Sequence, residues 1–196
     1  MGNRENRRRK NKLAKAKLRQ DTCLEDIDYR QRRGRDKSFI MALASCRWIA
    51  EHHNLLISGP TGVIKSFLAC TLGHKICLEG YSVSYKRVLS SCAKWSRPEG
   101  TAAVIKMIIA SSKTNLLILD DWGLEKLSRE QSLDMLEVLE DRYGRGSTIG
   151  TAQVPMDQWH ETINDSTLAD AILDRLIHNA YKINLKGEPM KKNGRA

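Results

Sequence analysis

The stretch Leu55-Leu-Ile-Ser-Gly-Pro-Thr-Gly-Val-Ile-Lys-Ser66 decides the fold of this 196-residue chain. Its apolar residues predict a short buried strand, and the glycine turn that follows ends in Lys65-Ser66, where a helix is predicted to begin. The pattern matches the phosphate-binding loop G-x-x-x-x-G-K-[ST], whose backbone N–H groups and lysine surround the phosphates of a nucleotide. Ile64 departs from it, because the pattern has its last glycine there. The candidate nucleotide-binding residues are Gly59, Pro60, Thr61, Gly62, Val63, Ile64, Lys65 and Ser66.

A second apolar run also ends in charged residues. Residues 116–119 are all aliphatic, which indicates a strand buried on both faces, and Asp120 and Asp121 follow directly. Ligands bind at the carboxyl ends of strands in open α/β sheets, so these acids are expected beside the glycine turn. The pair then suits a magnesium nucleotide, with the Ser66 hydroxyl on the metal, Asp120 holding the metal through water, and Asp121 polarising the attacking water. The alternative is that both acids merely end a strand in solvent.

The rest of the chain alternates short apolar runs with helical periodicity. We predict five strands, at residues 55–57, 81–85, 116–119, 147–151 and 181–185. We predict helices over 36–49, 65–78 and 130–143, two short ones within 88–112, one from Pro155, and one capped by Ser166 or Thr167. Alternation of this kind predicts a parallel sheet. The fold class is therefore α/β, of the P-loop NTPase type, with a parallel five-stranded sheet and helices on both faces.

Two further side chains are candidates for catalysis beside Asp121. Gln153 follows the predicted strand 147–151, where its amide would lie near the γ-phosphate, or it is an ordinary polar loop residue. Arg175 follows Asp174 on an otherwise apolar helix. We weigh two roles for Arg175, a pair with Asp174 or another surface acid, and an arginine finger on the nucleotide of a neighbouring subunit.

The positive charge of the chain is concentrated at its N-terminus. The net charge is +10, and residues 1–20 hold nine basic side chains against Glu5 alone, which is +8 of that total. Such a tract is typical of a solvated, poorly ordered arm, and it is also the electrostatic signature of a nucleic-acid binder. We favour the second interpretation. The candidate DNA contacts are Arg7, Arg8, Arg9 and Lys10. A second basic cluster near the C-terminus consists of Lys182, Lys186, Lys191, Lys192 and Arg195.

The composition indicates a globular protein of one domain, which we expect in the cytosol. Hydrophobic residues make up 41% and charged residues 29%, and no apolar run approaches the roughly 20 residues that a bilayer crossing needs. The N-terminus is charged with no apolar segment behind it, so no export signal is expected. The five cysteines form no C-x-x-C pair and are expected to be reduced thiols. Neither the cysteines nor the five histidines show the spacing of a metal site.

Several motifs outside the glycine turn are long enough to be compared with known families. They are residues 116–123 with Glu125, 139–144, 147–149, Pro155 with Trp159-His160, and 167–176. Together with the glycine turn they resemble the IstB-like family, the ATPase helpers of bacterial insertion-sequence transposition. The resemblance runs from about residue 20 to Lys192.

The resemblance implies an AAA+ core related to the replicative helicase loaders, with the strand before Gln153 lying between the other two site strands. Matched by position are the Walker A pair Lys65-Ser66, the Walker B acids Asp120-Asp121, the sensor-1 residue Gln153 and the arginine finger Arg175. It also implies ATP and Mg²⁺ as cofactors, ATP-dependent assembly into an oligomer on double-stranded DNA, and stimulation of a partner transposase. The corresponding domain plan is a flexible basic arm and linker over 1–35, an ATPase domain over 36–190, and a basic tail over 191–196.

The chain departs from the family pattern in three places. Ile64 replaces the last Walker A glycine, where a β-branched residue is unfavourable if φ is positive and adds bulk near the phosphates. Gly150 stands where the fourth strand usually has an aliphatic residue, which is expected to cost packing and order. The chain also begins at the basic arm, where relatives usually carry a small N-terminal region. Three hypotheses stay open: a working helper ATPase, a non-hydrolysing DNA-binding or assembly remnant, and a helicase-loader-like replication protein.

Overall fold

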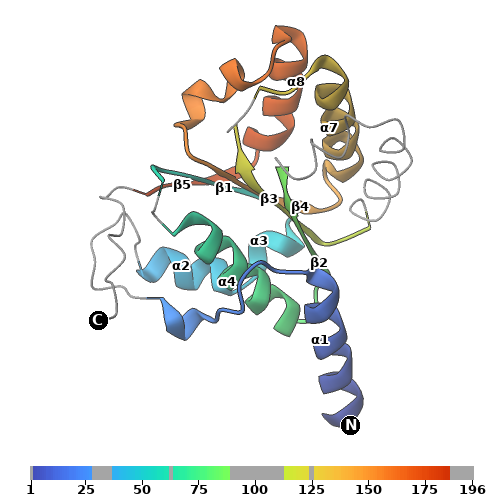
Figure 1. Ribbon diagram of the computed structural model, residues 1–196. Coiled ribbons are helices and arrows are strands. Elements are labelled where there is room, and N and C mark those ends of the chain that lie inside the picture. Colours follow the sequence, from blue (N-terminus) through green and yellow to red (C-terminus); the bar gives the residue numbers. More distant parts are fainter. Residues whose placement is uncertain (1, 28–36, 62–63, 89–112, 124–125, 186–196) are drawn as a thin grey trace, which may run out of the picture.

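A parallel sheet of five strands forms the centre of the protein (Figure 1). The computed structural model describes residues 2–27, 37–61, 64–88, 113–123 and 126–185. The strands are β1 (Asn54–Ser58), β2 (Val83–Arg87), β3 (Leu116–Trp122), β4 (Ser147–Ala152) and β5 (Ala180–Asn184). They lie in the order β2-β3-β4-β1-β5, and every neighbouring pair is parallel. The predicted fold class is confirmed, and β4 lies between β1 and β3 as the family resemblance implied.

Helices cover the two faces of the sheet (Figure 1). One face carries α2 (Lys37–Ala44), α3 (Arg47–Ala50) and α4 (Lys65–Leu78). The other carries α7 (Arg129–Arg142), the 3₁₀ helix η2 (Met156–Thr162) and α8 (Ser166–Ile177). Successive strand residues point to opposite faces, so Leu55 and Ile57 enter the apolar core around α4, whereas Leu56 enters the core around α7 and α8.

The burial of each strand explains its sequence pattern. Every residue of β1, β3 and β4 is buried, because these strands have neighbours on both sides and helices on both faces. A strand of this kind favours apolar side chains, and a polar one needs a hydrogen-bonding partner, which is why 116–119 is an unbroken aliphatic run. The edge strands β2 and β5 are more polar, with Val83 and Ile183 as their buried residues.

Two local predictions are wrong. The helix predicted over 36–49 is two helices, because Cys46 has a φ of 59° and turns the chain between α2 and α3. The cap of α8 is neither Ser166 nor Thr167 but Asp165, whose carboxylate accepts a hydrogen bond from the Leu168 backbone N–H at 3.1 Å. Aspartate caps a helix as well as serine does, so the sequence alone could not distinguish a cap at Asp165 from one at Ser166.

The N-terminal basic tract is a helix where we expected a poorly ordered arm. It forms α1 (Gly2–Ala16), and the short 3₁₀ helix η1 (Leu24–Asp26) follows. Arginine, lysine, alanine and leucine are good helix formers, so the tract has helical propensity of its own. Its last turn is anchored, because Ala16 is buried and Leu13 packs against the core around α4. The other end of α1 projects from the rest of the protein (Figure 1).

Several expectations fall on residues outside the described ranges. These are the two short helices within 88–112 beyond Val88, most of the C-terminal basic cluster, and the proposed boundaries of the domain plan at residues 35 and 190. The division into arm, ATPase domain and tail therefore stays a prediction. Among the helices that the structure describes, none has the length and apolar character that a bilayer crossing would require.

Gly150 does not weaken β4 as we expected. The strand pairs on both sides at this position, with Leu56 of β1 and Leu119 of β3. A Cβ atom on Gly150 would lie 3.2 Å from Leu56 Cδ2 and 3.4 Å from Trp159 Cη2. The missing side chain therefore leaves the room that the fully buried Trp159 ring fills, and this ring stacks on Trp122 with 5.9 Å between centroids.

Candidate nucleotide-binding site

The glycine turn joins the carboxyl end of β1 to the start of α4. Gly59 follows the strand with a φ of 153°, a conformation that favours glycine. Lys65 and Ser66 then form the first turn of α4, as predicted. The first turn of a helix presents backbone N–H groups without partners and the positive end of the helix dipole, and both favour an anion.

The Lys65 ammonium group lies inside this loop. Its Nζ donates to the carbonyl oxygens of Gly59 at 2.8 Å and Pro60 at 3.0 Å, and the residue is 5% exposed. Burial lowers the pKa of Lys65, and the negative charges of Asp121 and Asp120 oppose that shift. A lysine that is held on loop carbonyls has its charge beside the turn, where phosphate oxygens can replace those carbonyls as acceptors.

Asp120 is the centre of the site. Its side chain is completely buried, and three hydroxyl groups donate to its carboxylate. Ser66 donates at 2.8 Å to both Oδ1 and Oδ2, Thr151 donates to Oδ1 at 2.5 Å, and Tyr85 donates to Oδ2 at 2.5 Å. Burial, followed by the bond to Asp120, raises the pKa of Tyr85, so the phenol keeps its proton and donates it. These donors come from α4, β4 and β2, and they satisfy a carboxylate that would be costly to bury alone.

This arrangement of oxygen atoms fits a magnesium ion. Mg²⁺ prefers hard oxygen ligands and is usually bound by one or two carboxylates together with waters and substrate phosphates. The Ser66 hydroxyl and the Asp120 carboxylate lie in contact at the point where the loop becomes α4. Ser66 and Asp120 are therefore the residues that would hold Mg²⁺, and the ion would supply positive charge to offset that of the phosphates.

Asp121 leaves the regular strand and turns towards β2. β3 carries an irregularity between Leu119 and Trp122, and Asp121 has a φ of 63°, which aspartate tolerates better than most residues. Its backbone N–H donates to Thr151 Oγ1 at 3.1 Å, and its Oδ2 accepts from Arg87 Nε at 2.6 Å. That bond raises the pKa of Arg87. A carboxylate has two oxygen atoms, so Asp121 can accept a hydrogen bond from a water molecule at one oxygen while Arg87 is bound to the other.

Gln153 lies beside the loop. It follows the carboxyl end of β4, and its Oε1 accepts a hydrogen bond from Thr61 Oγ1 at 2.6 Å. The loop after β1, the acids at the end of β3 and the glutamine after β4 therefore meet at the carboxyl ends of the strands. Open α/β sheets bind their ligands at these ends.

Ile64 does not have the backbone strain that its sequence position suggested. Its φ is −71°, which any L-residue adopts, and its carbonyl accepts the Leu68 N–H at 3.0 Å as in a regular helix. A glycine is therefore not required there by the backbone conformation. The bulk of the isoleucine side chain is the remaining difference from the phosphate-loop pattern. The two loop residues before it, Gly62 and Val63, lie outside the described residues.

Arg175 lies near the amino-terminal end of β1, whereas the loop follows the carboxyl end of that strand. Its carbonyl accepts a hydrogen bond from Asn54 Nδ2 at 3.0 Å, and Asn54 begins β1. A strand of this length spans about 13 Å, so Arg175 does not approach the loop of its own chain. Its guanidinium pairs with Glu140 at 2.9 Å and Asp174 at 2.5 Å, and lies 5.2 Å from the Tyr143 ring centroid.

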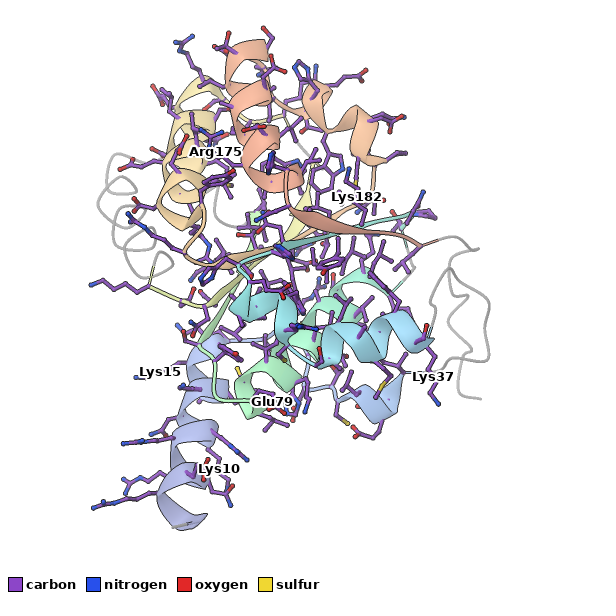
Figure 2. All side chains as sticks on the ribbon, turned by 180° about the vertical axis from the view of Figure 1, so that it is seen from behind. Lys10, Lys15, Lys37, Glu79, Arg175 and Lys182 are labelled. Carbon is purple, nitrogen blue, oxygen red and sulfur yellow. The ribbon has the colours of Figure 1, made fainter. Side chains whose placement is uncertain are left out.

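The candidate DNA contacts also lie away from the loop. Arg7, Arg8, Arg9 and Lys10 are exposed on the projecting half of α1, which Figure 2 shows with Lys10 labelled. Arg9 makes an exposed pair with Glu5 at 3.4 Å, which contributes little stability. The structure thus separates a nucleotide-binding edge of the sheet from a basic helix.

The sequence prediction missed three residues that hold the acids. Tyr85 lies in the middle of β2 and Arg87 ends it, and the parallel pairing of β2 with β3 sets Arg87 opposite Asp120. The order of these two strands would have been enough to place both residues near the acids. Thr151 is different, because its contact with Asp120 depends on the pairing of β4 with β3 and on the register that sets Leu119 opposite Gly150. No local signal in the sequence predicts that register.

The fold and this site define the class of protein, a P-loop NTPase of the AAA+ type. The sequence model of the IstB-like ATP binding protein family matches residues 1–196. The chain therefore belongs to the IstB-like family.

Individual relatives agree with this assignment. The chain is 50% identical over 184 residues to the insertion sequence ATP-binding protein y4pL of Sinorhizobium fredii, which covers 94% of this chain and 75% of the relative. Among solved structures it is similar to DnaI, with a TM-score of 0.74, 20% identity, and 90% and 94% of the two chains covered. The DnaC helicase loader gives a TM-score of 0.59 at 17% identity, covering 76% and 87%. At these identities the structural likeness concerns the fold.

Replacing Thr151 with valine should destabilise the protein by about 1–3 kcal/mol, because the buried Asp120 loses a donor and the Asp121 N–H loses its acceptor. Urea unfolding followed by circular dichroism measures this loss. Thr151→Ser is the matched control, since it keeps the hydroxyl and should lose less than half as much. A larger loss in Thr151→Ser than in Thr151→Val would mean that the methyl group, and not the hydroxyl, stabilises the site, because valine keeps the methyl and serine keeps the hydroxyl.

Proposed function

We propose that this protein is a DNA-binding ATPase that assembles on DNA with ATP and assists the transposase of an insertion sequence. The observation that carries the proposal is the meeting of Lys65, Ser66 and Asp120 at the carboxyl ends of β1 and β3. A lysine, a hydroxyl and a buried carboxylate at the start of one helix suit a magnesium nucleotide and few other ligands.

Each residue of this edge has a separate task in the proposed hydrolysis of ATP. Lys65 binds the β- and γ-phosphates once they replace the loop carbonyls. Ser66 and Asp120 hold the metal ion, which neutralises the phosphate charge. Asp121 polarises the attacking water, and the Gln153 amide orients the γ-phosphate. The site therefore supplies electrostatic stabilisation and positioning, which are the main demands of phosphoryl transfer.

The position of Arg175 supports assembly into an oligomer. An arginine at the amino-terminal end of β1 is too far from its own loop, so it can act on a nucleotide only in a neighbouring subunit. Head-to-tail contact, with the loop edge of one subunit on the opposite edge of the next, would bring the two together. In the isolated chain, Glu140 and Asp174 keep the guanidinium in place on α8.

Helix α1 supports the proposed DNA binding. Four successive basic residues surround the helix, and an α-helix with side chains is about 10–12 Å wide, which matches the major groove of about 12 Å. Contacts from such a helix go mainly to phosphates, so the binding is expected to depend on salt more than on sequence. The DNA contacts in this proposal are Arg7, Arg8, Arg9 and Lys10.

The transposase as partner is proposed from the family. Relatives such as y4pL are described as ATP-binding proteins of insertion sequences, and the partner of such a protein is most simply the transposase of the same element. The likeness to DnaI and to the DnaC helicase loader concerns the fold, so it does not favour a replication role. A transposase gene beside the gene for this chain would separate these two partners.

Saturating Mg²⁺ and ATP should raise the melting temperature by several degrees, because a ligand at 100 times its Kd adds about 2.7 kcal/mol of stability. Lys65→Ala should abolish the shift, and Ile64→Gly should enlarge it by removing bulk beside the phosphates. Differential scanning fluorimetry measures all three. A shift of the melting temperature that appears only in Ile64→Gly would favour the non-hydrolysing alternative. No shift in the unmodified protein or in Ile64→Gly would contradict the proposed nucleotide site.

Mixing two inactive variants tests Arg175 as a finger between subunits. Arg175→Ala and Lys65→Ala should each lack ATPase activity, but in an equal mixture roughly a quarter of the contacts pair an intact loop with an intact arginine, as expected for head-to-tail assembly. Phosphate release should recover accordingly. A mixture of Lys65→Ala with Asp120→Asn is the control and should stay inactive, since both changes damage the same edge. Recovery in both mixtures, or in neither, contradicts the role of Arg175.

Neutralising the four basic residues of α1 tests DNA binding. The variant with glutamine at positions 7–10 should bind duplex DNA at least tenfold more weakly, and the magnitude of the slope of log K against log salt should fall by about 3.6, which is about 0.9 for each of the four lost phosphate contacts. Fluorescence anisotropy at several salt concentrations measures both. The control removes the same charge from four exposed residues elsewhere, namely Lys113, Lys126, Arg145 and Lys182. Equal losses would mean that total charge, and not α1, determines the affinity.

A further inference from the structure

The segment that contains and follows the last turn of α1 runs along α4, and we call residues 12–27 the N-terminal strap. At one end of the strap, Lys12 Nζ donates to the carbonyl oxygen of Gly80, just after α4 ends. Further along, Thr71 in the middle of α4 makes a hydrogen bond of 2.9 Å with Thr22. The strap therefore connects the basic helix to the helix that begins at the nucleotide loop.

Arg19 lies in the middle of the strap and reaches the carboxylate at the centre of the site. Its Nη1 is 3.8 Å from Oδ2 of Asp120, the same oxygen to which Tyr85 donates. The Asp120 side chain is fully buried, whereas 47% of the Arg19 side chain is exposed. Arg19 can therefore move into solvent, while the carboxylate keeps its place through the hydroxyl groups around it.

Arg19 and a divalent cation compete for the same charge. Two cations beside one carboxylate repel each other, and this repulsion is strong where the surroundings are partly buried. The hydroxyl groups of Ser66, Thr151 and Tyr85 are neutral and do not repel a cation. With Arg19 in place the carboxylate is already partly neutralised, so a cation at Asp120 is favoured when Arg19 moves away.

We propose that Arg19 is a positioning residue that couples helix α1 to Asp120, so that a nucleic acid on α1 favours a divalent cation at Asp120. The strap continues directly from α1, so the phosphates of a duplex bound to α1 also attract the basic residues of the strap. This attraction draws Arg19 away from the Asp120 carboxylate. Coupling of this kind is reciprocal, so a cation at Asp120 also strengthens DNA binding. This inference rests on the proposed function, because it takes DNA and Mg²⁺ as the two ligands.

Lys17 offers a matched comparison for Arg19. It carries the same charge on the same strap and is exposed, and its φ of 52° turns the chain at the end of α1. Glutamine at either position removes one positive charge from the strap. A general effect of charge would change both variants equally, whereas the coupling depends on Arg19.

The first experiment follows the melting temperature during a Mg²⁺ titration without nucleotide. Arg19→Gln should lower the midpoint Mg²⁺ concentration by about threefold to tenfold, as expected for the loss of one nearby like charge, and Lys17→Gln should match the unmodified protein. An unchanged midpoint in Arg19→Gln overturns the proposal. So do equal midpoint changes in the two variants, or Mg²⁺ that affects neither the variant nor the unmodified protein.

The second experiment measures how the binding of a fluorescent ATP analogue depends on Mg²⁺, with and without a 20-base-pair duplex. The duplex should lower the Mg²⁺ midpoint of the unmodified protein and of Lys17→Gln, and leave that of Arg19→Gln unchanged. An equal duplex effect in all three overturns the coupling. If none of the three binds the analogue, the proposed function fails instead, and the titration without nucleotide still decides whether Arg19 opposes the cation.

Discussion

The buried carboxylate of Asp120 is the interaction on which the site depends. It has no contact with solvent, so its charge must be met by donors from within the protein. Those donors are hydroxyl groups from three elements, namely Ser66 of α4, Tyr85 of β2 and Thr151 of β4. By satisfying one carboxylate they hold the loop helix, an edge strand and a central strand in a common position, which is the preorganisation that catalysis by positioning requires.

Parallel topology brings these groups together. The carboxyl ends of β1, β3 and β4 meet at one edge, so a loop, a pair of acids and a glutamine that are distant in sequence become neighbours. The same topology places Arg175 near the amino-terminal ends of the strands, so its proposed role as an arginine finger requires a second subunit. The N-terminal strap adds a link of another kind, from a helix outside the sheet to Asp120 through Arg19.

Two of the departures from the family pattern, Gly150 and Ile64, have different physical meanings. At Gly150 the structure uses the missing side chain, because the Trp159 ring occupies the space beside it. At Ile64 the backbone is unstrained, and the effect of the residue reduces to the volume of its side chain beside the loop. A residue that departs from the family pattern can therefore be compensated by packing, as at Gly150, or can leave the backbone unstrained, as at Ile64.

The sequence by itself predicted the class of protein, the five strands, and the candidate residues Lys65, Ser66 and Asp120, which the structure brings together. These features depend on local patterns, since aliphatic runs, glycine turns and strand ends are visible within a few residues. Only the tertiary structure decided that Thr151 and Tyr85 hold Asp120, that α1 is an anchored helix, and that the strap brings Arg19 to the same carboxylate. Those contacts depend on strand register and on packing between distant segments, and neither leaves a local signal in the chain.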